Sequence, residues 1–124
     1  MDKLKPLVEH SNLKMFIAVP LNPKYDPTDA FSSPERFHIV HVDYETASAI
    51  GDSVFSKLAF ESIDNYPIEP FEDPFFEPED IPTLLKCLEK WVPVPGSHEE
   101  RTFQIVKDLL LEAESRGVGI YFKF

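Results

Sequence analysis

Apolar residues recur at helical spacing in two segments of the second half of the chain. Between residues 79 and 92 they fall three, four, seven and ten positions after the first, which predicts one apolar stripe along a helix. Pro82 lies in the first turn of this helix, where a missing N–H costs little. Pro93 and Pro95 end it. The predicted stripe consists of Ile81, Leu84, Leu85, Leu88 and Trp91.

A second helix is predicted from Ser97 onward. Ser97 and Glu100 have the spacing of a capping box, in which each residue satisfies a free N–H at the start of a helix. Gly117 follows Arg116 and is the expected left-handed residue at the helix end. The apolar stripe of this helix consists of Phe103, Val106, Leu109, Leu110 and Ala113.

Three short segments have the composition of β-strands. Residues 13–19 are an apolar run ended by Pro20, which cannot continue a hydrogen-bonded ladder. Residues 37–45 are rich in β-branched and aromatic side chains, and alternation places the more apolar face, expected to meet the core, on His38, Val40, Val42 and Tyr44. The other face carries Phe37, Ile39, His41 and Asp43. Residues 119–124 form a terminal strand with one face consisting of Ile120, Phe122 and Phe124.

Residues 46–60 fit two structures. Ala47, Ile50, Val54 and Leu58 follow helical spacing, whereas Gly51-Asp52 is also a hairpin turn sequence. We interpret the segment as a helix, because one glycine inside a helix costs only about 1 kcal/mol. Residues 21–35, with three prolines, are expected to form a loop. The whole chain, residues 1–124, is predicted to be one α+β domain: a small, mostly antiparallel sheet covered on one face by two or three helices.

The charge of the chain is concentrated in one stretch. The chain carries a net charge of −10. Residues 61–80, called the acidic stretch below, hold eight carboxylates and no Lys or Arg, while the other residues carry 14 acids against 12 bases. Aromatic side chains and prolines are set among these carboxylates. Such a surface attracts a basic partner, offers aromatic anchors and is stiffened by proline.

We therefore predict that the acidic stretch contacts a basic protein partner. Two alternatives stay open: a solvated loop before a helix that favours carboxylates at its start, and a Ca²⁺ site, although the spacing is not that of an EF-hand. The predicted contact residues are Asp64, Glu69, Phe71, Glu72, Asp73, Phe75, Phe76, Glu77, Glu79 and Asp80.

Signs of catalysis are weak. His41 and Asp43 could pair on one strand face, but no serine lies in a nucleophile-elbow sequence, and the four glycines form no phosphate-binding loop. Cys87, the only cysteine, borders an apolar stripe and is expected to be buried. We expect no enzyme activity, no cofactor and no metal.

A pI near 4.7 disfavours nucleic acid and anionic membranes as partners. Without an apparent signal peptide or membrane span, the expected location is cytoplasmic.

Residues 71–124 resemble small acidic bacterial proteins, some of them immunity proteins of polymorphic-toxin and contact-dependent inhibition systems. The resemblance rests on the segment FFEPEDIPTLLKCLEKW, the second helix and the aromatic end GIYFKF. It implies a non-enzymatic inhibitor that covers the active site of a basic toxin domain. The rival hypotheses are a structural or adaptor domain, forming a homodimer through Phe71, Phe75 and Phe76, and a small hydrolase or metal-dependent enzyme that uses His41, Asp43 and loop carboxylates.

Overall fold

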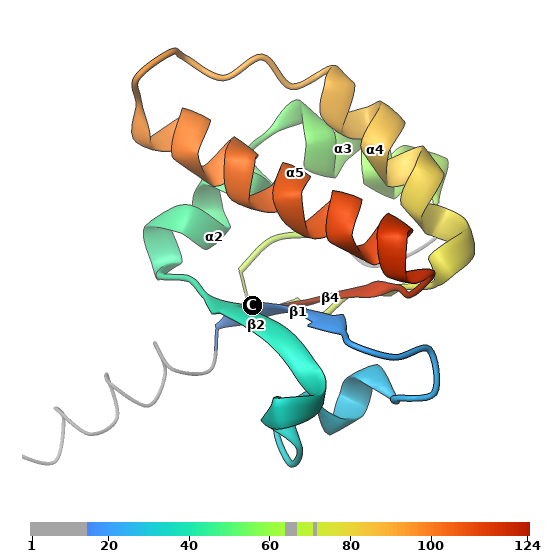
Figure 1. The fold of residues 1–124 in the computed structure, drawn as a ribbon. Coiled ribbons are helices and arrows are strands. Elements are labelled where there is room, and N and C mark those ends of the chain that lie inside the picture. Colours follow the sequence, from blue (N-terminus) through green and yellow to red (C-terminus); the bar gives the residue numbers. More distant parts are fainter. Residues whose placement is uncertain (1–14, 64–66, 71) are drawn as a thin grey trace, which may run out of the picture.

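The computed structural model describes residues 15–63, 67–70 and 72–124, and within them the chain forms one sheet with helices on one face (Figure 1). The sheet is antiparallel throughout, with the strand order β2-β1-β4-β3. This confirms the predicted α+β class. The strands are β1 (Phe16–Pro20), β2 (Phe37–His41), β3 (Phe75–Phe76) and β4 (Ile120–Lys123), and the α-helices are α2 (Tyr44–Gly51), α3 (Val54–Ser62), α4 (Ile81–Glu89) and α5 (His98–Arg116).

The last strand of the chain lies inside the sheet. β4 pairs with β1 on one side, where Phe16 is opposite Lys123, and with β3 on the other, where Phe75 is opposite Tyr121. Both predicted strands are present but shorter than predicted, because Met15, Gly119 and Phe124 lie just outside β1 and β4. Residues 13 and 14 lie outside the described residues. Pro20 occupies the last position of β1, where it ends the ladder.

The main core fills the space between the sheet and the helices. β1 and β4 contribute Ile17, Val19, Ile120 and Phe122, all fully buried. The apolar stripes predicted for residues 79–92 and for the helix after Ser97 face this core, with Leu85 and Phe103 only partly buried at its edge. Cys87 is buried here, as expected. The first helix is shorter than predicted, because a 3₁₀ turn, η3 (Pro78–Asp80), replaces its start and α4 ends at Glu89.

The predicted ends of α5 are confirmed. The Ser97 hydroxyl accepts a hydrogen bond from the Glu100 N–H at 3.2 Å. The Glu100 carboxylate accepts from the N–H of Gly96 at 3.1 Å, so the reciprocal half of the box is displaced by one residue. Gly117 has φ +68°, the left-handed conformation that glycine adopts without strain.

The predicted strand over residues 37–45 is too long. β2 ends at His41, and Asp43 instead caps α2, its carboxylate accepting a hydrogen bond from the Thr46 N–H at 2.8 Å. This capping satisfies a free helix N–H, and the Thr46 hydrogen bonds lower the pKa of Asp43. Tyr44 therefore lies on a helix. The proposed His41–Asp43 pair on one strand face is wrong for the same reason.

The segment over residues 46–60 is helical, and the hairpin alternative is wrong. It consists of two helices rather than one, because the chain breaks at Asp52-Ser53. The Ser53 hydroxyl donates to the Ile50 carbonyl at 2.6 Å and accepts from the Ser56 N–H at 3.3 Å. Ser53 thus ends one helix and starts the next.

The loop between β1 and β2 covers the second face of the sheet. It contains two 3₁₀ helices, η1 (Pro27–Ala30) and η2 (Pro34–Arg36), and lies opposite the α-helices in Figure 1. Phe37 is buried beneath it with Phe16, Ala18 and Ala30. The alternation predicted for β2 holds, since Val40 packs against the main core. Its less apolar face is nevertheless covered, which a strand pattern alone does not reveal.

Candidate functional site

The acidic stretch contains part of the core as well as part of the surface. Phe76 is 1% exposed and meets Phe122 edge-to-face, with ring centroids 6.0 Å apart. Phe76 is therefore not an exposed anchor, either for a partner or for a second copy of the chain. Asp64 and Phe71 lie outside the described residues.

Phe76 is buried because the stretch forms an edge strand that was not predicted. The Pro74 carbonyl accepts a hydrogen bond from the Phe122 N–H at 3.0 Å, and the Glu72 carbonyl accepts from the Phe124 N–H at 3.2 Å. Successive side chains of a strand point to opposite faces. With Phe76 in the core, Phe75 points to the second face of the sheet and stays partly exposed.

The predicted carboxylates lie in separate places. Glu69 borders a hollow beside α3 together with Lys57 and Phe60. Asp80 turns back on its own segment and accepts a hydrogen bond from the Glu77 N–H at 3.2 Å. Glu79 is exposed on η3, and Glu72 is partly buried.

Three of the predicted residues come together in one groove. Asp73, Phe75 and Glu77 line a groove of about 510 Å³ on the second face of the sheet. Its walls come from three segments far apart in the sequence: residues 20–28, 73–78 and 118–121. The complete lining consists of Pro20, Pro23, Lys24, Tyr25, Asp26, Pro27, Thr28, Asp73, Phe75, Glu77, Pro78, Val118, Gly119 and Tyr121.

The groove is acidic. Its lining holds three carboxylates, those of Asp26, Asp73 and Glu77, and one basic side chain, Lys24. A second cation, Lys123, pairs with Asp73 beside the lining, so the carboxylates still outnumber the cations. Asp26 Oδ1 accepts hydrogen bonds from the Thr28 hydroxyl at 2.7 Å and from its N–H at 2.9 Å. These bonds lower the pKa of Asp26. Its carboxylate therefore stays charged at a lower pH than an ordinary aspartate does.

The electrostatics of the groove also affect Tyr121, one of its two tyrosines. Burial raises the pKa of the Tyr121 hydroxyl, and the negative charge of Asp73 raises it further. At neutral pH Tyr121 is therefore a neutral hydrogen-bond donor and adds no charge of its own to the groove.

A lysine of the chain already binds one of the groove carboxylates. Lys123 Nζ lies 3.0 Å from both Oδ1 and Oδ2 of Asp73. Both side chains are partly exposed, and ion pairs of this kind contribute only about 0–1 kcal/mol. The pair shows where a cation fits against Asp73, and its low strength leaves the carboxylate open to exchange with a cation from outside.

Three aromatic rings line the groove between the charges. Phe75 and Tyr121 come from neighbouring strands, and Tyr25 comes from the loop that covers the sheet. The guanidinium of Arg36 lies 5.2 Å from the centre of the Tyr25 ring. The Tyr121 ring meets the Phe16 ring edge-to-face, with ring centroids 6.1 Å apart. This contact holds Tyr121 against the small core that contains Phe16 and Phe37 beneath the loop.

The groove residues outside the acidic stretch were not predicted from the sequence. Residues 23–27, with the sequence PKYDP, combine proline, an aromatic ring and a carboxylate, the same mixture as the acidic stretch. That shared composition was a usable signal. Tyr121 was also predictable, because alternation along the terminal strand places its side chain on the face of the sheet away from Ile120 and Phe122.

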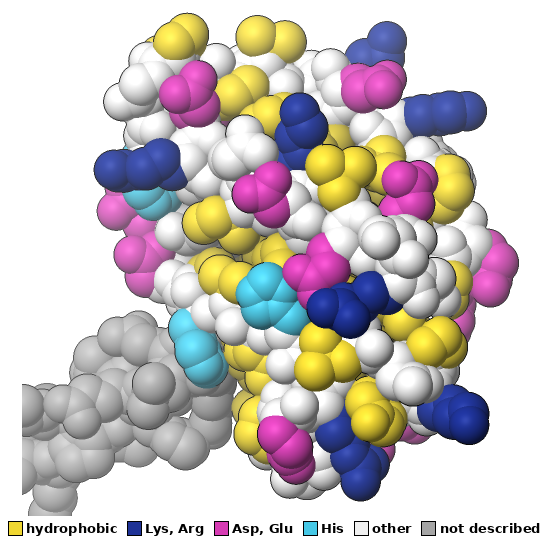
Figure 2. Space-filling view, viewed as in Figure 1, with side chains coloured by type: hydrophobic (Ala, Val, Ile, Leu, Met, Phe, Trp, Pro, Cys, Tyr) yellow, Lys and Arg dark blue, Asp and Glu magenta, His cyan; other side chains and the backbone are white. Residues whose placement is uncertain are grey.

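The helix-covered side of the molecule has a different surface. Where α5 lies in front, acidic and basic side chains are interspersed with apolar ones (Figure 2). His38 Nδ1 lies 2.5 Å from the Glu112 carboxylate, which also accepts from Arg116 at 3.0 Å. Among the described residues, no three His, Cys, Asp or Glu side chains gather as a possible metal-ion site.

Comparison with protein-family models, with curated proteins and with solved structures gives no significant match. Among the helices that the structure describes, none combines the length and apolar character needed to cross a bilayer.

Proposed function

We propose that the chain is a non-enzymatic binding module whose groove takes a basic segment of a partner protein. One observation carries this proposal: three distant segments bring carboxylates and aromatic rings together in one hollow. Carboxylates speed the encounter with a basic partner, and aromatic rings supply contact area that is desolvated on binding. Neither feature alone would favour a protein partner to the same degree.

The more specific role that we propose is that of a cytoplasmic immunity-type inhibitor. It is supported by the resemblance of residues 71–124 to small acidic immunity proteins and by the charge of the groove. Toxins that cleave nucleic acid bind phosphates through Lys and Arg. A groove lined by carboxylates presents these cations with a substitute for the phosphate backbone, and so blocks the toxin's binding site.

Charge reversal in the groove should slow association with the partner. Affinity purification from the source cells, or the product of the neighbouring gene, supplies the candidate partner for binding measurements by interferometry. Asp73→Lys with Glu77→Lys should reduce the association rate at least about tenfold at low salt and flatten its dependence on ionic strength. Both side chains are exposed, so the two substitutions alter the surface charge and not the core.

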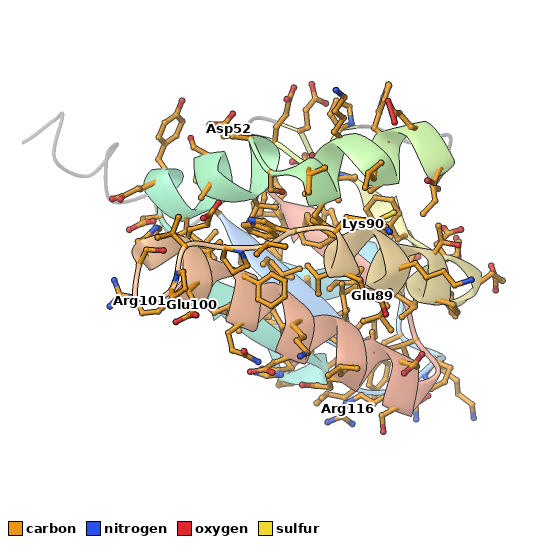
Figure 3. The ribbon with its side chains drawn as sticks, turned by 90° about the horizontal axis from the view of Figure 1, so that it is seen from above. Asp52, Glu89, Lys90, Glu100, Arg101 and Arg116 are labelled. Carbon is orange, nitrogen blue, oxygen red and sulfur yellow. The ribbon has the colours of Figure 1, made fainter. Side chains whose placement is uncertain are left out.

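The control changes the same total charge elsewhere. Asp52 and Glu89 lie in the helix layer (Figure 3), outside the groove lining, and both are exposed. Asp52→Lys with Glu89→Lys should leave most of the association rate intact. Equal loss with both variants would show that net charge, not the groove, attracts the partner, and the proposal would fail.

A further inference from the structure

The walls of the groove offer few backbone N–H groups to an incoming chain. Four of its fourteen lining residues are prolines, which have no N–H. Five others already donate theirs within the protein, at 2.9–3.2 Å. These five are Lys24, Tyr25, Thr28, Glu77 and Val118.

This shortage of donors decides how an extended segment can bind. A segment added as a β-strand needs ladder partners along the wall, and β3 is only two residues long, with Pro74 before it and Pro78 beyond it. A polyproline II segment has no such need, because its backbone makes no ladder hydrogen bonds and stays solvated. The wall chemistry therefore favours a polyproline II occupant.

The aromatic lining favours the same occupant. Proline-rich segments in the polyproline II conformation dock on grooves lined by aromatic side chains. Tyr25, Phe75 and Tyr121 supply such rings here. The polyproline II helix is preformed, so little conformational entropy is lost when it binds.

The carboxylates specify which residues accompany the prolines. Asp73 already holds Lys123 through both oxygens. The planar guanidinium of arginine matches two carboxylate oxygens better than an ammonium group does. Polyproline II has three residues per turn and rises about 3.1 Å per residue, so arginines at every third position lie on one face, about 9 Å apart.

We infer that the groove binds a proline-rich segment in the polyproline II conformation that carries arginine at three-residue spacing. This inference rests on the proposed function and identifies the kind of segment that the partner presents. Prolines dock on the aromatic rings, while arginines bind the carboxylates of Asp73, Glu77 and Asp26.

Three fluorescent nonapeptides test the inference by anisotropy with the full chain. One repeats Arg-Pro-Pro, the second Arg-Gly-Ser and the third Gln-Pro-Pro. We expect the Arg-Pro-Pro peptide to bind at least about tenfold more tightly than either of the others, since each lacks one of the two features. Equal binding of the two arginine peptides would overturn the polyproline inference and leave the proposed function standing. If no peptide binds, the inference fails, and the partner measurements decide the proposed function separately.

Variants of the chain locate the peptide. Tyr25→Leu keeps an apolar side chain but removes the flat ring, and should weaken the Arg-Pro-Pro peptide at least about threefold while barely affecting Arg-Gly-Ser. Glu77→Gln should weaken both arginine peptides, whereas Glu89→Gln on the helix layer should weaken neither. Unchanged binding of Arg-Pro-Pro to both the Tyr25 and Glu77 variants would place the peptide elsewhere and overturn the inference.

Discussion

Replacing Gly119 with alanine should destabilise the protein by about 3 kcal/mol and separate β3 from the sheet. A Cβ at this position would lie 2.0 Å from the Phe76 carbonyl oxygen and 3.0 Å from two carbons of the Phe75 ring. Backbone atoms cannot move aside as the end of a flexible side chain can, and overpacking of this kind costs about 1–3 kcal/mol or more. The added methyl group should therefore push β3 away from β4.

Urea denaturation measures the free energy of unfolding, and amide exchange at Phe122 and Phe124 reports on the contact between the terminal strand and residues 72–74. Gly96→Ala is the matched control. Gly96 has φ +75°, but a Cβ there would meet nothing within 4 Å, so only backbone strain of about 1 kcal/mol is expected. If the two variants unfold alike, and exchange at Phe122 and Phe124 is unchanged, the close contact at Gly119 is not what holds β3 in place.

Replacing Phe76 with alanine should cost about 3–5 kcal/mol of folding free energy, as expected for a large buried aromatic side chain. Phe76 is 1% exposed in the main core. Its neighbour Phe75 is partly exposed in the groove. Phe75→Ala should cost only about 1 kcal/mol, because its ring is incompletely removed from water.

Only one of the two variants should weaken binding. Phe75→Ala should speed dissociation of the partner and weaken binding by about 2 kcal/mol or more, whereas the fraction of Phe76→Ala that remains folded should bind with nearly normal affinity. Denaturation curves and dissociation rates separate these outcomes. A larger loss of stability from Phe75→Ala than from Phe76→Ala would reverse the assignment of the two rings.

The long helices were predictable because their signals are local and repeated. The stripe from Ile81 to Trp91 spans about three helical turns, and the signals at Ser97 and Gly117 each involve only the adjoining turn. The structure confirms them. β3 was not predictable in the same way. Two aromatic residues between prolines have the pattern of a loop, and only pairing with a strand more than 40 residues later makes them a strand.

The groove was predictable only in part. Charge clustering pointed to Asp73, Phe75 and Glu77, but it also included Phe76, because a count of charges and rings does not tell which side of a strand faces the core. The opposite wall depends on how the loop after β1 folds over the sheet, where Phe37 is buried beneath it. That arrangement is tertiary, and PKYDP shows it only through its similar composition.

We propose that the groove, rather than the helix-covered face, binds the basic partner. Nuclear magnetic resonance of the ¹⁵N-labelled chain, titrated with the unlabelled partner, tests this proposal most directly. We expect the largest amide shifts in the non-proline residues of 23–28, 73–78 and 118–121, the three segments that together line the groove. Shifts confined to α4 and α5, around Glu89, Lys90, Glu100 and Arg101 (Figure 3), with those three segments unchanged, would contradict it.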